Sequence, residues 1–292
     1  MFVLSCCTII DMPKSFYQER SLHYLMLQYQ IDGTFHRDEI GTPENYKEFY
    51  QKIREGAMPT TSQINPTEFV ERFETLLKEG KDVLHISLSS GISGTYHSAA
   101  EAQKILQKKY PERKLYVLDS LAASAGCGLL VTLASDMQKS GASIDEVHDW
   151  LEENKRKVNH LFFTTDLTHL KRGGRVSSTA ALLANILHIC PLMTVNYEGK
   201  LVPMEKIRSV KKCIKTAVSR MLELADKGAD YDGYCYISHS DIMDVAQDLK
   251  SQIQESFPKI KEICISDIGR VIGSHTGPGT VAFFFVGKKR TS

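Results

Sequence analysis

HISLSSGISGTYHSAAEAQKIL, residues 85–106, places an apolar run, a loop of small hydroxyl and glycine residues, and a helical pattern in immediate succession. The apolar run is typical of a buried strand, and the loop joins this strand to the helix. Such a unit presents backbone N–H groups and the positive end of a helix dipole, which together favour an anion. The loop lacks the lysine of a nucleotide phosphate loop, so we do not expect the anion to be the phosphate of a nucleotide.

Strands and helices are predicted to alternate around this unit. Asn65 can cap a helix in which Glu68 completes a capping box, and Ser143 and Glu146 form a second capping box. Apolar residues recur at helical spacing behind the first of these caps. This alternation predicts a parallel sheet covered by helices. The predicted strands are residues 82–88, 114–120 and 160–165, and the predicted helices are residues 65–80, 98–110, 122–141 and 143–157.

The pattern changes beyond a predicted boundary near residue 158. Residues 166–178 form a loop, residues 179–188 an apolar helix, and residues 196–199 (NYEG) read as a hairpin turn, which introduces antiparallel pairing. We therefore predict two lobes, residues 1–157 and residues 158–292, of α/β or α+β class. The other elements predicted in the second lobe are strands at 189–195, 200–205, 233–239, 262–268 and 280–287, and helices at 209–227 and 244–257.

Composition and charge argue against several classes of function. The formal net charge of the 292 residues is +1, without a strongly basic tract, so nucleic acid is not an expected partner. Seven scattered cysteines without a C-x-x-C pair are typical of reduced thiols in a cytosol. No apolar stretch reaches the roughly eighteen residues of a membrane-spanning helix. We expect a soluble, cytoplasmic protein that does not span a membrane.

The familiar catalytic and cofactor motifs are absent from the sequence. There is no nucleotide phosphate loop, and GCG at residues 126–128 lacks the third glycine of a dinucleotide-binding fingerprint. GISGT at residues 91–95 misses the nucleophile-elbow pattern, because Thr95 stands where glycine is required. The histidines have no metal-ligand spacing. We therefore expect neither a cofactor nor a metal.

Three stretches of small residues are the remaining candidates for a site. They are MPTTSQ at residues 58–63, SSGISGTY at residues 89–96 and GSHTGPG at residues 273–279, and each is predicted to be a loop. Hydroxyls, glycine backbone and a histidine can hold a carboxylate or phosphate oxygen by hydrogen bonds. Turn chemistry alone explains any one of these loops. The three together favour a binding site.

These motifs, with LKRGGRVS and GKLVPMEKIRSVKK, occur in the order and approximate spacing seen in the DegV family, which the chain resembles over essentially its whole length. The resemblance implies a two-lobed α/β fold whose N-terminal lobe has a mainly parallel sheet and whose C-terminal lobe has a mixed sheet. It also implies a carrier that holds one long-chain fatty acid, with its tail in an apolar tunnel. In bacteria with a fatty acid kinase, such a carrier presents the lipid for phosphorylation, and the acyl phosphate then enters phospholipid synthesis.

The resemblance also implies roles for single residues. Thr61 and Ser93 match hydroxyls that contact the carboxylate, and His275 matches the neighbouring histidine. Arg172 and Arg208 match basic positions near the mouth, where kinase contact is expected. We expect His85 and His188, which lie on apolar runs, to be core residues rather than ligands. Supporting positions in the same motifs are Ser62, Gly94, Thr95, Ser274 and Thr276.

The sequence departs from the family pattern at two places. Cys7 and Thr8 stand where the family usually has Asp and Ser, and Ile64 and Asn65 precede a proline that often follows TSQ directly. We expect these changes to affect the loop beside the head-group cluster and the lipid preference more than the fold.

The chemistry favours a carrier over an enzyme. Each buried methylene contributes about 0.8 kcal/mol, so a chain of about sixteen carbons gains on the order of 10 kcal/mol before entropic costs. Neutral hydrogen bonds of about 1 kcal/mol each orient the head group instead. The alternative is an acyl hydrolase with Ser93 as nucleophile and His275 as base, although no third group is evident to orient the histidine.

Overall fold

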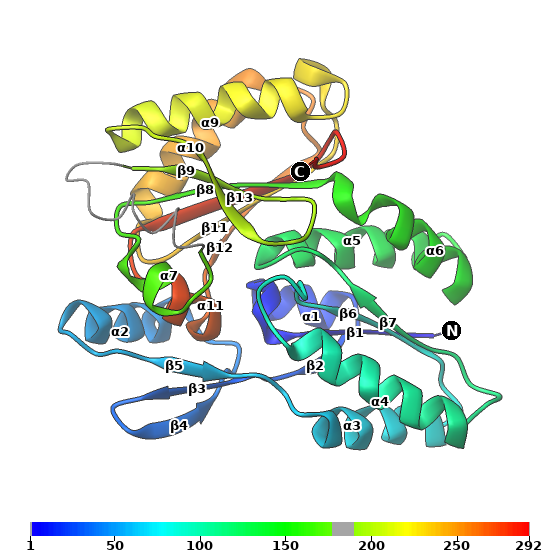
Figure 1. Cartoon of the computed structure of the whole chain (residues 1–292). Coiled ribbons are helices and arrows are strands. Elements are labelled where there is room, and N and C mark those ends of the chain that lie inside the picture. Colours follow the sequence, from blue (N-terminus) through cyan, green and yellow to red (C-terminus); the bar gives the residue numbers. More distant parts are fainter. Residues whose placement is uncertain (1, 177–189, 292) are drawn as a thin grey trace.

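The strand at the start of the quoted stretch lies inside a four-stranded parallel sheet. The computed structural model describes residues 2–176 and 190–291, and Figure 1 shows this sheet in the N-terminal half of the chain. All five residues of β6 are buried, because strands lie on both sides and helices cover both faces. The strands, in their order across the sheet, are His23–Leu25 (β2), Val3–Cys7 (β1), Val83–Ser87 (β6) and Leu115–Asp119 (β7).

Four helices cover the two faces of this sheet, as the alternation predicts. α3 and α4 pack together on one face, and α5 and α6 lie on the other (Figure 1). Asn65 caps α3 by accepting a hydrogen bond of 2.9 Å from the N–H of Glu68, but the carboxylate of Glu68 pairs with Arg37 instead of completing a capping box. The box of Ser143 and Glu146 is confirmed. These helices are Pro66–Lys78 (α3), Thr95–Lys109 (α4), Ala125–Lys139 (α5) and Ile144–Asn154 (α6).

A small antiparallel sheet, which the sequence patterns did not predict, belongs to the same half of the chain. Thr61 pairs with Tyr29 in it, so the prediction of a loop at residues 58–63 is wrong for the central part, which is an extended strand. In order across the sheet, its strands are Thr34–Arg37 (β4), Gln28–Ile31 (β3) and Thr60–Ser62 (β5). The remaining elements of this half are the helices Lys14–Glu19 (α1) and Pro43–Arg54 (α2) and the short 3-10 helices Thr8–Ile10 (η1) and Lys155–Lys157 (η2).

The C-terminal half forms a six-stranded mixed sheet. Among its strands in the described residues, only β11 and β12 pair in parallel, and the predicted turn at residues 196–199 joins the antiparallel strands β9 and β10. The predicted helix at residues 179–188 lies outside the described residues. The strands, in their order across the sheet, are Leu201–Glu205 (β10), Leu192–Val195 (β9), Val158–Thr164 (β8), Thr280–Val286 (β13), Tyr234–His239 (β11) and Glu262–Asp267 (β12). The predicted α/β class, with a parallel N-terminal sheet and a mixed C-terminal sheet, is confirmed.

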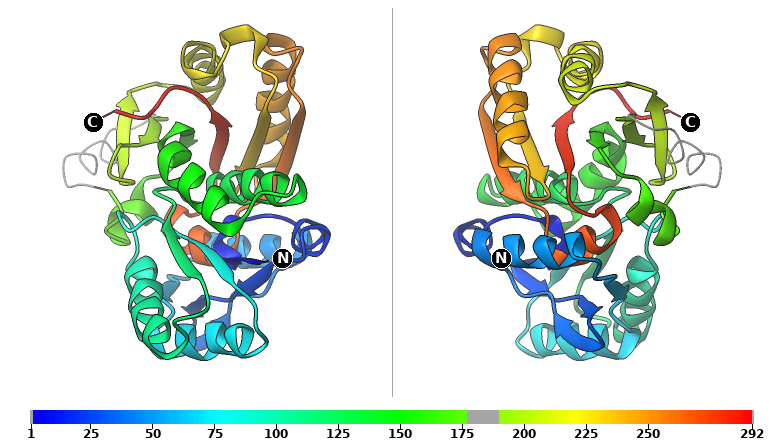
Figure 2. Two further views of the ribbon diagram at one scale, coloured as in Figure 1. Left: turned by 90° about the vertical axis from the view of Figure 1, so that its right-hand side faces the viewer. Right: turned by 90° about the vertical axis from the view of Figure 1, so that its left-hand side faces the viewer.

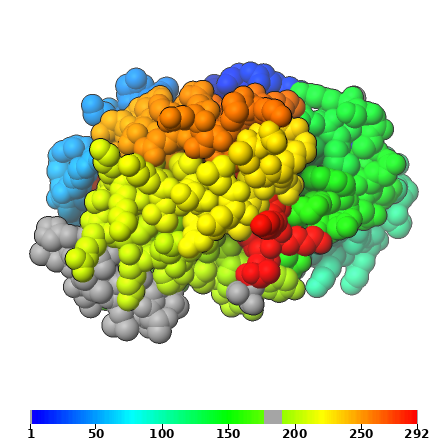
Figure 3. Space-filling view, turned by 90° about the horizontal axis from the view of Figure 1, so that it is seen from above, coloured from blue at the N-terminus to red at the C-terminus, as the bar shows by residue number. Residues whose placement is uncertain are grey.

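Helices cover both faces of the mixed sheet. α9 and α10 lie on its outer face, and Figure 3 shows them at the surface of this lobe. α5 packs against β8, β11 and β13 on the inner face as well as against β1 and β6, so it lies between the two sheets (Figures 1 and 2). The other elements of this half are the helices Thr168–Arg172 (α7), Val210–Leu224 (α9), Met243–Ser256 (α10) and Arg270–Thr276 (α11) and the 3-10 helix Gly228–Asp230 (η4).

The short helix α11 belongs to the C-terminal half but packs against the N-terminal elements α2, β3 and β5. The prediction of a loop over residues 273–279 is wrong for its first part, because the helix continues through His275 to Thr276 and the turn begins at Gly277, with φ of +67°. Its N-terminal end is held by the buried Tyr50, whose hydroxyl donates a hydrogen bond of 2.6 Å to the carbonyl of Ile268.

The division into residues 1–157 and 158–292 separates the strands of the six-stranded sheet from all the others. One large hydrophobic cluster nevertheless contains side chains from both halves, including Phe73, Phe162 and Phe284. The division into two domains at this boundary stays a prediction. All seven cysteines are free thiols, and no helix within residues 2–176 and 190–291 has the length and apolar character needed to cross a membrane.

We expect Tyr50→Phe to lower the free energy of unfolding by about 1–2 kcal/mol, because the buried carbonyl of Ile268 loses its hydrogen-bond donor. Denaturant unfolding followed by circular dichroism measures this change. The matched control is Tyr24→Phe at an exposed position, which should change stability by less than about 0.5 kcal/mol. Equal stabilities of the two variants would contradict the role given to Tyr50.

Candidate functional site

A cavity of about 410 Å³ lies between the two lobes. This volume is typical of a site for a small organic molecule, for which cavities of about 300–1,000 Å³ are usual. Its walls come from β5, β8, β9, β10 and β13, from α7 and α11, and from the loops that follow β6 and precede α5. The apolar lining consists of Leu27, Leu88, Ile92, Ala123, Phe162, Leu170, Val195, Leu201, Ile268, Val271, Ile272, Ala282 and Phe284.

Strand β13 gives the cavity its direction. Thr280, Ala282 and Phe284 all line it, as expected for alternate residues on one face of a strand, and together they extend along roughly 13 Å. Thr280 donates a hydrogen bond of 3.4 Å to the carbonyl of Thr276, the neighbour of His275. We call the end beside His275 the polar end and the end at Phe284 the aromatic end.

The polar end brings together residues from all three predicted motifs. Thr61 of β5 and His275 of α11 share a hydrogen bond of 2.8 Å between Oγ1 and Nε2. Ser93, in the loop before α4, also lines the cavity, and its hydroxyl accepts a hydrogen bond of 3.2 Å from the backbone N–H of Thr95. The supporting residues Ser62, Gly94 and Thr276 line the cavity too.

Two of the supporting residues lie behind the wall. Thr95 is fully buried and its hydroxyl is 2.9 Å from that of Ser93, so it orients the serine. Ser274 donates a hydrogen bond of 2.7 Å to the carbonyl of Arg270 within α11. Neither residue belongs to the cavity lining, and both act on the local backbone and side chains instead.

The imidazole of His275 is a neutral hydrogen-bonding group at pH 7. Burial, followed by the nearby positive charges of Arg175 and Arg172, lowers the pKa of His275 to about 4. The ring also lies close to Gly173, where a Cβ atom would collide with Nδ1. Glycine at this position therefore lets the loop after α7 approach the histidine.

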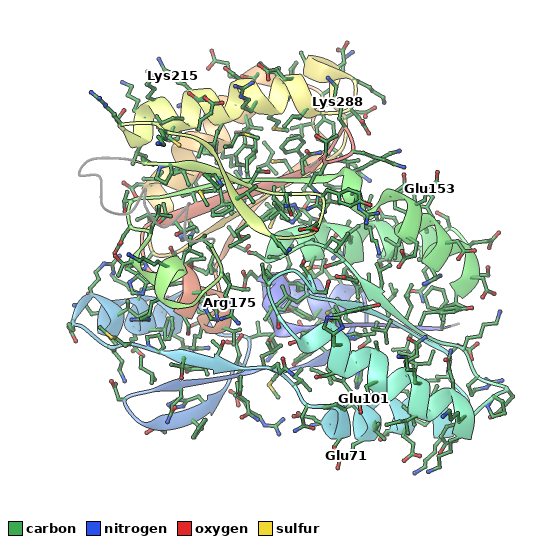
Figure 4. The ribbon with its side chains drawn as sticks, viewed as in Figure 1. Glu71, Glu101, Glu153, Arg175, Lys215 and Lys288 are labelled. Atoms are coloured by element: carbon green, nitrogen blue, oxygen red, sulfur yellow. The ribbon has the colours of Figure 1, made fainter. Side chains whose placement is uncertain are left out.

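Arg175 is a lining residue that the sequence analysis did not single out. Its Nε donates a hydrogen bond of 3.1 Å to the carbonyl of Ile92, and its Nη1 donates to the carbonyl of Gly173. Figure 4 labels Arg175 near α11, and its side chain is half-buried. It belongs to the same LKRGGR motif as Arg172, so the motif contained the signal but did not say which arginine faces the cavity.

The two arginines that the sequence analysis did name are exposed. Arg172 is at the end of α7, where its Nη2 is 3.5 Å from Nδ1 of His169, and Arg208 follows β10. Neither lines the cavity, although Leu170 of α7 and Leu201 of β10 do. Their assignment to partner contact stays a prediction.

Thr8, one of the two family departures near the end of β1, lies in a buried polar network beside the N-terminal end of α11. Thr8 donates a hydrogen bond of 3.4 Å to Asp38, and Asp11 accepts hydrogen bonds from Ser124 and from the backbone N–H of Gly269. Burial raises the pKa of Asp11 to about 8 and that of Asp38 to about 6. This network holds the chain at the N-terminal end of α11.

The histidine expected in the core is there. His85 is fully buried and its Nδ1 is 3.0 Å from the hydroxyl of Ser5, while its Nε2 is 3.9 Å from the sulfur of Cys7. Burial lowers the pKa of His85 to about 3. His188 lies outside the described residues.

The geometry gives no support to the hydrolase alternative. His275 pairs with Thr61 and Ser93 pairs with Thr95, and in the described part of the chain no hydrogen bond joins Ser93 to His275. An activated serine nucleophile has its base within hydrogen-bond reach. Within the same residues, no group of three or more His, Cys, Asp or Glu side chains is placed to hold a metal ion.

Comparisons with known proteins identify relatives along nearly the whole chain. The family model described as "Uncharacterised protein, DegV family" matches residues 8–288. A DegV domain-containing protein from Clostridium perfringens is 43% identical over 286 residues, which cover 98% of this chain and 97% of that protein.

Two solved structures of similar proteins have the same fold. A DegV family protein from Thermus thermophilus, described as binding fatty acid, is 30% identical with a TM-score of 0.86, and the match covers 98% of this chain and 99% of that one. DegV from Bacillus subtilis, described as a fatty acid binding protein, is 31% identical with a TM-score of 0.83 and the same coverage.

We expect His275 to contribute a loss of stability as the pH falls from 6.5 to about 4. Its pKa in the folded protein is below the ordinary value of 6.5, so the unfolded chain binds the proton first and is favoured in this interval. His275→Gln should therefore lose less stability than the wild type between pH 7 and pH 4.5 in thermal unfolding, whereas the exposed His97→Gln should behave like the wild type. A variant at His275 with the wild-type pH profile would show that its pKa is not lowered.

Proposed function

The chain belongs to the DegV family, and we propose that it binds one long-chain fatty acid, with the carboxylate at the polar end of the cavity and the acyl chain extending toward the aromatic end. The cavity itself carries this proposal, because it is lined mainly by apolar side chains and has the hydroxyl of Thr61 and the charge of Arg175 near His275. The two solved relatives described as fatty acid binding proteins support the same class of ligand.

The acyl chain supplies most of the affinity in this proposal. At about 0.8 kcal/mol per methylene, a chain of about sixteen carbons gains on the order of 10 kcal/mol before the entropic costs of binding. Phe162, Ala282 and Ile272, which come from β8, β13 and α11, offer apolar surface to the chain. A small polar metabolite would leave these walls in contact with water.

In this proposal, one positively charged side chain and two hydroxyl donors hold the carboxylate. The hydroxyls of Thr61 and Ser93 donate to it, and Arg175 supplies the positive charge for a charge-assisted hydrogen bond. His275 remains neutral and orients Thr61 through their shared hydrogen bond. Each hydroxyl contributes about 1 kcal/mol and decides which end of the lipid faces Arg175.

We further propose that the protein is a cytoplasmic carrier which presents the bound carboxylate to a fatty acid kinase, so that the acyl phosphate formed there enters phospholipid synthesis. Arg172 on α7 and Arg208 after β10 are exposed on elements that also contribute to the cavity wall. Exposed cations beside the site are suited to contact an acidic surface on the kinase. The resemblance of both arginines to family positions supports this assignment.

The proposal predicts that native protein carries close to one long-chain fatty acid per chain. Organic extraction followed by mass spectrometry measures the amount and identity of the lipid.

Delipidated Ser93→Ala should bind a long-chain fatty acid about 5–30-fold more weakly than the wild type, because one hydroxyl donor of about 1–2 kcal/mol is lost while the tail remains buried.

Two outcomes would contradict the carrier. Native protein that contains no lipid and also fails to bind labelled palmitic acid after purification would remove the proposed ligand. A covalent adduct on Ser93 after incubation with an activated acyl ester, seen by intact mass and accompanied by turnover, would establish the hydrolase instead.

The proposed partner contact predicts that Arg172→Ala and Arg208→Ala bind fatty acid like the wild type but are phosphorylated about tenfold more slowly by the fatty acid kinase of the source organism, because a charged contact across the interface is lost. A coupled assay of acyl phosphate formation measures this rate. The control is Arg72→Ala, an exposed arginine on α3 outside the cavity wall. Loss of lipid binding in the two variants with normal phosphorylation of the remaining lipid would show that the roles are misassigned.

A further inference from the structure

Two aromatic side chains form the wall at the aromatic end of the cavity. Phe284 of β13 and His160 of β8 are paired residues of neighbouring strands, and both line the cavity. Their rings meet edge to face, with centroids 5.2 Å apart and planes at 89°. The two rings therefore form part of the cavity lining at the aromatic end.

The imidazole of His160 is fixed within this wall. Its Nδ1 donates a hydrogen bond of 3.1 Å to the carbonyl of Val158, and its Nε2 accepts one of 3.4 Å from the backbone N–H of Ala123. The side chain is 2% exposed, and burial holds the pKa of the imidazole well below its usual range. The ring is therefore neutral, and turning it away would break both hydrogen bonds.

Gly126 in the first turn of α5 lies directly behind both rings. A Cβ atom at this position would be under 3.0 Å from Nε2 of His160 and 2.9 Å from Cδ1 of Phe284. Contacts this short force a neighbour to move. Both rings line the cavity and Gly126 does not, so a displacement of the rings away from α5 would change the cavity wall at this end.

We propose that the contact of Gly126 with His160 and Phe284 sets the longest fatty acid that the cavity accepts. The inference rests on the proposed function and assigns to these three residues the chain-length limit. With glycine at position 126, the two rings leave the greatest length of cavity for the acyl chain. Any larger residue at this position shortens that length.

The same helix contains a matched control position. Gly128 also lies in the first turns of α5, and a Cβ atom there would be 2.9 Å from Cγ of Met12 and 3.3 Å from the carbonyl of Ile10. Gly128→Ala therefore introduces the same methyl group with milder crowding, and it does so against the flexible side chain of Met12 rather than against the cavity wall. Gly128 does not line the cavity.

The experiment compares delipidated wild type, Gly126→Ala, Gly128→Ala and Phe284→Leu for their affinities toward dodecanoic, myristic, palmitic and stearic acids. Each methylene that can no longer be buried in the cavity lowers the affinity about fourfold. For each protein, the affinity for the longest acid that the wild type accepts is divided by the affinity for dodecanoic acid. This ratio should be at least about fourfold lower in Gly126→Ala than in the wild type. Phe284→Leu removes a ring without removing a hydrogen bond and should shift the preference toward longer acids. Gly128→Ala should keep the wild-type profile.

The outcomes separate the inference from the function on which it rests. A wild type that binds none of the four acids overturns the proposed function. If the wild type binds these acids and both Gly126→Ala and Phe284→Leu have the same chain-length profile as the wild type, the chain-length limit alone is overturned. An equal shift of the profile in Gly128→Ala overturns it as well. Thermal unfolding checks that each variant is folded, and if Gly126→Ala is not, the profile of Phe284→Leu decides.

Discussion

The hydrogen bond between Thr61 and His275 joins the two halves of the chain at the polar end of the cavity. It requires α11, a C-terminal element, to lie against β5, an N-terminal strand. The N-terminal half also holds the other end of α11 by two hydrogen bonds. The hydroxyl of Tyr50 donates to the carbonyl of Ile268, and the carboxyl of Asp11 accepts from the backbone N–H of Gly269. Most of what the site can do depends on this one helix being held by residues far away in sequence.

The same placement explains why the site combines polar and apolar character. α11 carries Val271 and Ile272 on the turns that face the cavity and His275 at its end, so one short helix contributes both to the tail path and to the head-group cluster. β13 follows α11 in the chain and shows the opposite trend, from Thr280 at the polar end to Phe284 at the aromatic end. A ligand with one charged end and a long apolar tail matches both elements at once.

The sequence predicted the elements whose signals are local and missed those that depend on distant partners. β6, α4, β7 and α5 follow from apolar runs, caps and helical spacing within a few residues. β5 was missed because a three-residue strand exists only through its pairing with β3. α11 was missed because glycine, serine and threonine near its end are typical of turns, whereas its packing against α2 and β5 keeps it helical.

The candidate site was predicted in the same uneven way. Thr61, Ser93 and His275 were found from their motifs, and all three line the cavity. Arg175 was not singled out, because two glycines separate it from Arg172 and Gly174 has φ of +67°, so the direction of the chain between the two arginines cannot be read from spacing. The wall of His160 and Phe284 depends on strand register between residues 124 positions apart, for which the sequence has no local signal.

A crystal structure of the protein with a fatty acid that carries bromine on its terminal carbon tests the central claim most directly. Anomalous scattering locates the bromine without ambiguity, and the electron density locates the carboxylate. The account predicts the carboxylate beside Thr61, Ser93 and Arg175 and the bromine near His160 and Phe284. A bromine beside Arg175, or a fatty acid bound outside this cavity, would contradict it.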